Sequence, residues 1–163
     1  MGRLGCNCGA IMSSVDCPSQ NLIHIYTEQE ATEALRENPS IRLWDFRIKQ
    51  RKYEYWFCTA CHRVHQVDVE KGECIKRYRP IGESCNQLGI IGVPLGWQEL
   101  YVITDTELDK ITEQDFAITL GAYLPQIKRR VMISPDYQTA KVFDVATGYE
   151  TESYIAENIS SAI

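Results

Sequence analysis

No long apolar run, low-complexity segment or hydrophobic leader occurs in this sequence of 163 residues. A helix that spans a membrane needs about 18 or more mostly apolar residues in a row, and no stretch approaches that length. The segment from Met1 to Cys6 also lacks the apolar region of a secretory signal. We therefore expect a globular, cytoplasmic protein without a membrane partner, long enough for one ordinary domain or two small ones.

Motifs of common enzyme chemistry are absent as well. The sequence shows no recognisable pair of catalytic carboxylates, no glycine-rich phosphate loop and no nucleophile elbow. A nucleophilic cysteine needs a histidine and an orienting residue beside it, and nothing in the sequence brings His24 to Cys17. We therefore expect a protein that is not an enzyme.

Cysteine, in contrast, is plentiful. The chain has seven cysteines, and an odd number without a leader argues against a framework of disulfides. Two pairs are closely spaced, Cys6 with Cys8 and Cys58 with Cys61. A C-x-x-C turn offers two thiolates to one metal ion, and four thiolates complete the tetrahedral shell of Zn²⁺. We predict that these four cysteines bind one structural zinc ion, with iron as the alternative because iron–sulfur clusters use the same donors.

Other donors are less well placed for a metal. His62 and His65 lie next to the second cysteine pair, but His65 falls on the strand that follows, where we expect a surface histidine. Cys17, Cys74 and Cys85 have no partner at ligand spacing, so we interpret them as small hydrophobic side chains. A closed site with four thiolates leaves no coordination position for a reactive water, so we expect it to support folding only.

Alternation and turn residues predict most secondary structure. Strands are expected at residues 22–26, 52–58, 63–69 and 75–78, and residues 1–20 are expected to form a loop. Thr27-Glu28-Gln29-Glu30 is a capping box, which predicts a helix that ends before Pro39. Gly72 suits the left-handed position of a tight hairpin between the last two of these strands.

Similar signals return about 77 residues later. Residues 100–103 again suggest a strand, Thr104 and Glu107 form a second capping box, and Gly148 suits a second hairpin. We predict an α+β fold of two tandem β-α-β-β-β repeats with antiparallel meanders. Residues 1–80 would be the repeat braced by zinc and residues 81–163 the repeat without metal. Convergent turn chemistry in an ordinary α+β protein is the alternative.

Charge is unevenly distributed along the chain, whose net charge is −5. Residues 40–80 hold ten Lys or Arg and five Asp or Glu, whereas the remainder holds seven and seventeen. Such asymmetry indicates an interaction surface, although two parts of opposite charge can also simply attract each other. The residues that we expect to form a basic binding face are Arg47, Lys49, Arg51, Lys52 and Arg63.

The hairpin with Cys58 and Cys61 resembles a zinc ribbon or rubredoxin-like knuckle. The resemblance covers residues 1–80 and depends on the four cysteines. A single residue separates Cys6 from Cys8 where a ribbon has two, so the ribbon topology is less supported than the metal. The Cys-x-Cys-Gly start and the Trp-x-Cys-x-x-Cys-x-Arg hairpin are also similar to small uncharacterised bacterial proteins, some of them suspected immunity proteins. That likeness assigns no functional residues.

Two functions are compatible with these features. The first is a non-catalytic, zinc-stabilised module that binds another protein, such as an inhibitor or immunity protein whose acidic surface blocks a basic partner. The second is a nucleic-acid-binding protein that uses the basic face, with Tyr53 and Tyr55 stacking on bases. A salt-dependent shift with single-stranded DNA or RNA would distinguish the two.

Overall fold

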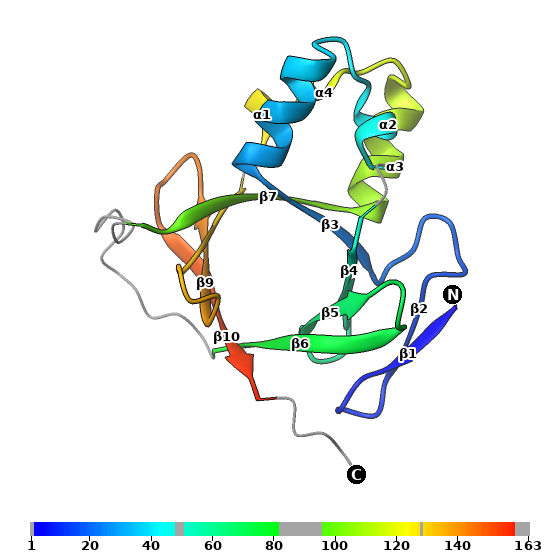
Figure 1. Ribbon diagram of the computed structural model, residues 1–163, viewed down its shortest axis with the longest axis vertical. Coiled ribbons are helices and arrows are strands. Elements are labelled where there is room, and N and C mark those ends of the chain that lie inside the picture. The colour runs from blue at the N-terminus through cyan, green and yellow to red at the C-terminus, as the bar shows by residue number, and fades with distance from the viewer. Residues whose placement is uncertain (1, 48–50, 82–95, 128, 159–163) are drawn as a thin grey trace.

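In the computed structural model, the strands of the chain close into one antiparallel barrel (Figure 1). The structure describes residues 2–47, 51–81, 96–127 and 129–158. The strands are β1 (Arg3–Gly5), β2 (Ile11–Ser13), β3 (Leu22–Thr27), β4 (Tyr53–Phe57), β5 (Val64–Asp68), β6 (Glu73–Pro80), β7 (Gln98–Thr104), β8 (Arg129–Ile133), β9 (Thr139–Asp144) and β10 (Glu150–Glu157). The helices are α1 (Glu28–Glu37), α2 (Leu43–Arg47), α3 (Asp105–Gln114), α4 (Leu120–Tyr123) and the 3₁₀ turn η1 (Leu124–Gln126).

Eight strands form the barrel in the order β10-β6-β5-β4-β3-β7-β8-β9. The pairings that join distant parts of the chain are β3 with β7, where Ile25 lies opposite Val102, and β6 with β10, where Arg79 lies opposite Ile155. A closed barrel has no edge strand, because each strand pairs with a neighbour on both sides.

The predicted fold of two tandem β-α-β-β-β repeats is therefore wrong. The described chain is mostly β, and its strands do not form two separate meanders. Each separate meander would have exposed two edges, and the pairings of β3 with β7 and of β6 with β10 satisfy those edges instead. The boundary predicted near residue 80 falls where β6 ends, and the segments before and after it each contribute four strands to the same barrel.

Local helix signals were predicted correctly. The Thr27 hydroxyl accepts a hydrogen bond from the Glu30 backbone N–H at 3.1 Å, and the Glu30 carboxylate accepts one from the Thr27 N–H at 2.8 Å. Thr104 and Glu107 form the same reciprocal pair at the start of α3. These contacts satisfy amide groups that a helix start leaves without a partner inside the helix.

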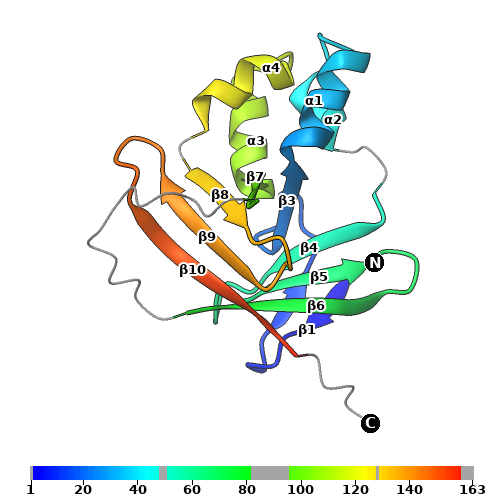
Figure 2. The same ribbon diagram turned by 60° about the vertical axis from the view of Figure 1, so that its left-hand side comes forward.

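The first hydrophobic core lies outside the barrel, between the helices and the outer face of β3 and β7 (Figures 1 and 2). Tyr26 and Ile103 point outward from these strands into it, and the ring centroids of Tyr26 and Phe46 are 4.2 Å apart.

None of the helices in the described part of the chain combines the length and the apolar character that a membrane crossing requires.

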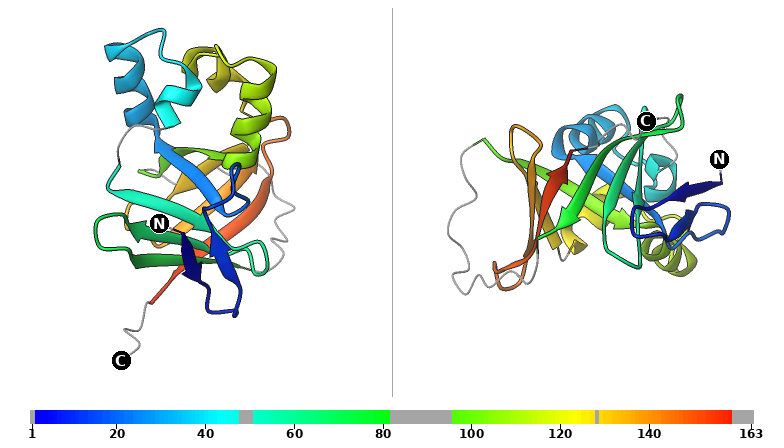
Figure 3. Two further views of the ribbon diagram at one scale, coloured as in Figure 1. Left: turned by 90° about the vertical axis from the view of Figure 1, so that its right-hand side faces the viewer. Right: turned by 90° about the horizontal axis from the view of Figure 1, so that it is seen from below.

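A second core lies under the β1–β2 hairpin, which packs against the outside of β4 and β5 (Figure 3). Residues 1–20 were predicted to be a loop, but Leu4 pairs with Met12 in a short antiparallel ladder. Met12 is 1% exposed and packs with Trp56 and Val67, which point outward from the barrel wall. This packing holds the N-terminal turn, which carries Cys6, against the barrel.

Candidate functional site

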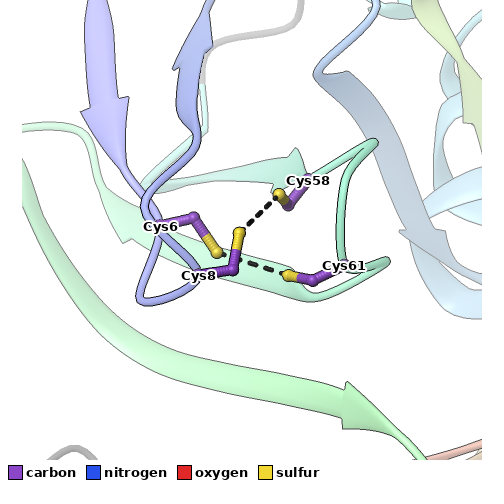
Figure 4. Close-up of side chains that lie close together, drawn as sticks. All are labelled: Cys6, Cys8, Cys58 and Cys61. Carbon is purple, nitrogen blue, oxygen red and sulfur yellow. Dashed lines mark hydrogen bonds between the residues drawn. The ribbon is translucent and has the colours of Figure 1, made fainter.

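Two turns bring four cysteines together outside the barrel (Figure 4). Cys6 and Cys8 come from the β1–β2 turn, and Cys58 and Cys61 come from the turn between β4 and β5. All four Sγ atoms lie within 4.8 Å of one another, with Cys6 and Cys61 at 3.5 Å and Cys8 and Cys58 at 3.6 Å. Thiolates about 2.3 Å from one tetrahedral ion would be about 3.8 Å apart. The cluster therefore has the size and donor set to hold a metal ion.

The backbone shapes both turns in a similar way. The Gly9 N–H donates to the Cys6 carbonyl at 2.9 Å, and the His62 N–H donates to the Cys58 carbonyl at 2.7 Å. Gly9 and His62 both have positive φ angles, 91° and 60°, which turn the chain sharply after each cysteine pair. Because backbone hydrogen bonds already fix both turns, the thiols are positioned by the fold itself.

Arg63 influences the charge of the cluster. Burial raises the pKa of the Cys6 thiol to about 12. Burial also raises the pKa of Cys61, but hydrogen bonds from Arg63 and from neighbouring thiols outweigh it and lower that pKa to about 6. Arg63 thus favours the thiolate form of Cys61. Arg63 is itself held by Glu157, with Nε 3.1 Å from Oε2.

Neither nearby histidine belongs to the cluster. His62 is exposed, and its ring stacks on Phe57 with centroids 5.6 Å apart. The prediction of a surface position for His65 is wrong, because this side chain is 0% exposed. Its Nδ1 accepts a hydrogen bond from Arg77 Nε at 3.2 Å. Burial, followed by the charges of Arg77 and Arg63, lowers the pKa of His65 to about 4.

The three remaining cysteines differ in their surroundings. Cys17 is exposed, so it does not pack as a small hydrophobic side chain. Cys74 is partly buried, and its thiol donates to the Lys76 carbonyl at 3.4 Å. Cys85 lies outside the described residues. Neither Cys17 nor Cys74 belongs to the cluster of four.

Most of the residues predicted to form a basic face are engaged within the chain. The ion pairs are Arg47 with Asp105 at 3.0 Å, Arg51 with Glu30 at 3.6 Å and Arg63 with Glu157 at 3.1 Å. Lys52 lies over the Tyr53 ring, 5.3 Å from its centroid, and Lys49 lies outside the described residues. Arg47 and Arg51 both act on Tyr26, whereas Arg63 contacts Cys61 in the cluster, and binding through these residues stays a prediction.

A large cavity occupies the interior of the barrel. Its volume is about 930 Å³, and side chains from all eight barrel strands line it. Ile25, Tyr55 and Val102 point inward yet are only partly buried, whereas both hydrophobic cores lie outside the barrel wall. The inward-facing side chains therefore surround open space and do not fill it.

The cavity has two chemically different walls. The aromatic wall lies on the side of β4, β5, β6 and β10 and consists of Tyr53, Tyr55, Phe57, Tyr78, Tyr154 and, from the β8–β9 turn, Tyr137. The aliphatic wall lies on the side of β3, β7, β8 and β9 and consists of Ile23, Ile25, Leu100, Val102, Val131, Ile133 and Val142. The aliphatic wall draws on four neighbouring strands, whereas the aromatic side chains come from β4, β6 and β10, and β5 between them contributes Val64 and Gln66.

Sequence reasoning missed this cavity. Tyr53, Tyr55 and Phe57 alternate along the strand predicted at residues 52–58, and side chains two residues apart share one face of a strand. Alternation does not reveal whether that face meets a packed core, solvent or an enclosed space. Trp56 lies on the other face of the same strand, and it is also buried, in the second core. The sequence therefore did not show which face of the strand points into the barrel.

Fold and site together define a class: an antiparallel barrel with an apolar internal cavity and a four-cysteine cluster on its outer wall. The chain belongs to the family described as domain of unknown function (DUF8617), whose model matches residues 2–84, just over half of the chain. That segment includes all four clustered cysteines and strands β1 to β6. No zinc-ribbon family matches the chain, so the support for that resemblance is limited to the four clustered cysteines. No curated protein and no solved structure matches the chain.

Proposed function

We propose that this protein binds a small, largely apolar molecule inside the barrel, and that the cysteine cluster holds a structural zinc ion beside the binding cavity. The cavity carries the proposal. Its volume of about 930 Å³ lies in the range typical of small-molecule sites, which are concave and mostly apolar. Eight-stranded barrels either fill their interior with side chains or hold one small ligand, and this interior is open.

Physical chemistry supports an occupant. Protein interiors are normally packed as densely as organic crystals, and water next to apolar surface costs about 25 cal/mol per Å². An unfilled interior lined by side chains such as Ile25 and Val102 therefore leaves free energy that an apolar ligand would recover. Evolution of a closed barrel around such a space is more readily explained by binding than by stability.

Zinc is the metal that suits the cluster best. Four thiolates are soft donors, which exclude magnesium and calcium and select zinc or iron. Tetrahedral zinc fills all four positions with sulfur and leaves none for water, so its contribution here would be structural. Metal analysis of purified protein separates zinc from iron directly.

The hypotheses of a protein-binding module and of nucleic-acid binding stay predictions. Nucleic-acid stacking by Tyr53 and Tyr55 would need these rings on the surface, but both line the cavity. Arg47, Arg51 and Arg63 have acidic partners within the chain. Binding of a small molecule has the more direct structural support, and the protein need not perform any reaction.

Fluorescence titration with N-phenyl-1-naphthylamine, an uncharged apolar dye, tests the proposal. We expect saturable binding of one dye per barrel. Ile25 and Val102 are cross-strand partners on the neighbouring strands β3 and β7, and both line the cavity. Replacement of both by Phe adds bulk to this part of the wall, narrows the cavity and should weaken dye binding. Val145→Phe, at an exposed turn, is the matched control and should bind as the parent does. Non-saturable binding, or equal affinity in the narrowed variant, would refute the proposal.

A further inference from the structure

The two walls of the cavity differ in the surface that they offer to a ligand. Aromatic rings present flat faces that stack on other rings, and the aromatic wall brings several of them to one side. Side chains such as Ile25, Val102 and Val131 cover the opposite side with branched aliphatic groups. A flexible acyl chain gains nothing from this segregation, because it packs against either surface, whereas a flat ring has a stacking partner on one side only.

Charges around the cavity are already paired or lie at the strand ends. Arg51 pairs with Glu30 at 3.6 Å, and Arg129, the first residue of β8, pairs with Glu107 at 2.6 Å. Glu152 accepts a hydrogen bond from the Tyr154 hydroxyl at 2.8 Å. Lys52 precedes β4 and interacts with the Tyr53 ring.

This distribution of charge disfavours an ionised ligand. Among the described residues, the central lining of β3, β4 and β7 contains no charged side chain. A carboxylate or ammonium group at that depth would lose its hydration without gaining a counter-ion.

One polar pair does lie in the middle of the aromatic wall. Tyr55 on β4 and Gln66 on β5 are direct cross-strand partners, and both side chains line the cavity. Neither side chain forms a hydrogen bond with another residue in the part of the chain that the structure describes. Side chains of such cross-strand partners begin about 5 Å apart, so both can reach one group between them.

The hydroxyl of Tyr55 is a donor at neutral pH. Burial raises the pKa of Tyr55, which keeps the phenol protonated. The Gln66 amide can both donate and accept. A ligand that excludes water from these two polar groups leaves them without a partner unless it supplies one, so a ligand with a matching carbonyl or hydroxyl would be selected over one without it.

We infer that the ligand is an uncharged molecule with a flat ring and a hydrogen-bonding group, whose ring stacks on the aromatic wall and whose polar group contacts Tyr55 and Gln66. This inference depends on the proposed function and adds the chemical class of the ligand. Tyr55 and Gln66 are then the residues that determine specificity. Apolar contacts elsewhere in the cavity supply affinity for any molecule of suitable size.

Three fluorescent probes test the inference. Prodan, 6-propionyl-2-(dimethylamino)naphthalene, is flat and uncharged and carries a ketone; N-phenyl-1-naphthylamine is flat and uncharged and has no carbonyl; cis-parinaric acid is a linear anion. We expect Prodan to bind more tightly than cis-parinaric acid. Tyr55→Phe and Gln66→Met should each weaken Prodan binding by about threefold to tenfold, the usual effect of one lost hydrogen bond. In these two variants the emission of bound Prodan should lie at shorter wavelength than in the parent protein. The affinity of the variants for N-phenyl-1-naphthylamine should equal that of the parent.

Tyr149→Phe is the matched control, because it removes the hydroxyl of an exposed tyrosine that does not line the cavity. We expect Prodan binding and emission in this variant to equal those of the parent, and circular dichroism to confirm that each variant is folded. Tighter binding of cis-parinaric acid, or equal effects of Tyr55→Phe and Tyr149→Phe, would overturn the ligand class while the proposed function stands. Failure of all three probes to bind would overturn the proposed function itself.

Discussion

Phe57 and Cys58 are neighbours in the chain, yet their side chains lie on opposite faces of the barrel wall. Phe57 lines the cavity, and Cys58 joins the cysteine cluster outside. Across the turn, Cys61 and His62 repeat this relationship, and the His62 ring stacks on Phe57. One hairpin therefore supplies half of the cluster and part of the cavity lining.

Metal content is the first prediction. Purified protein should contain one zinc ion per chain by elemental analysis, and Cys58→Ser should lose it, because one of four thiolates is removed. Structural zinc supplies folding free energy, so this variant should be less stable by several kcal/mol in denaturant titrations. Cys17→Ser is the matched control, since Cys17 is exposed and is not one of the four clustered cysteines. Metal-free protein with undiminished stability in a chelator would contradict the prediction.

Removal of the metal should also affect the cavity. Without an ion, the turn after Phe57 keeps its backbone hydrogen bonds but loses the metal link to the N-terminal hairpin, so Phe57 and His62 should become less fixed. We expect chelation to weaken the binding of N-phenyl-1-naphthylamine in fluorescence titrations. The Cys58→Ser variant, already without metal, should show no further change when chelator is added. Equal dye affinity of the zinc-loaded and chelated proteins would show that metal binding at the cluster does not affect ligand binding.

Local chemistry made part of this fold predictable. The capping boxes at Thr27 and Thr104 depend on side chains three residues apart, and Gly72 adopts the predicted left-handed conformation with φ of 67°. Closure of the barrel depends on pairings such as Arg79 with Ile155, far apart in the sequence. Strand alternation looks the same in a meander and in a barrel, so the sequence could not reveal that closure.

Within the site, the four cysteine ligands could be predicted because few residue types bind a metal ion, and they must lie close together. Metal coordination requires clustered donors, and the spacings of Cys6 with Cys8 and Cys58 with Cys61 predicted which thiols come together. Burial of His65 depends on what packs over the outer face of β5, which its own neighbours in the sequence do not reveal. Inward orientation of Tyr55 likewise depends on the closed barrel.

Asp105 is expected to be a major determinant of stability. Its side chain is 5% exposed and accepts hydrogen bonds from the Ser19 N–H at 2.8 Å and His24 Nε2 at 2.9 Å, while Arg47 lies at 3.0 Å. Asp105→Ala leaves these donors without a partner, so it should lower the free energy of unfolding by about 3–5 kcal/mol. Asp109→Ala, on the same helix but only partly buried, should cost far less. Comparable losses in the two variants, measured in urea, would contradict this role.

His65 should make the protein sensitive to mild acid. Burial and the charges of Arg77 and Arg63 lower the pKa of His65 to about 4, whereas an unfolded histidine titrates near pH 6.5. Below about pH 6.5 the histidine of the unfolded chain becomes protonated, whereas His65 in the folded chain stays neutral until about pH 4. The contribution of His65 to stability is therefore fully present above about pH 6.5 and declines as the pH falls toward about 4. The loss should reach about 2–3 kcal/mol over this window.

His65→Gln isolates this contribution from the carboxylates that also titrate in acid. Glutamine does not ionise, and its carbonyl can accept the hydrogen bond that Arg77 Nε now donates to His65 at 3.2 Å. Urea titrations between pH 7 and about pH 4.5 should therefore show a shallower decline in stability for the variant than for the parent. The two proteins should differ most at the acidic end. Parallel curves would mean that His65 is protonated as readily in the folded chain as in the unfolded one.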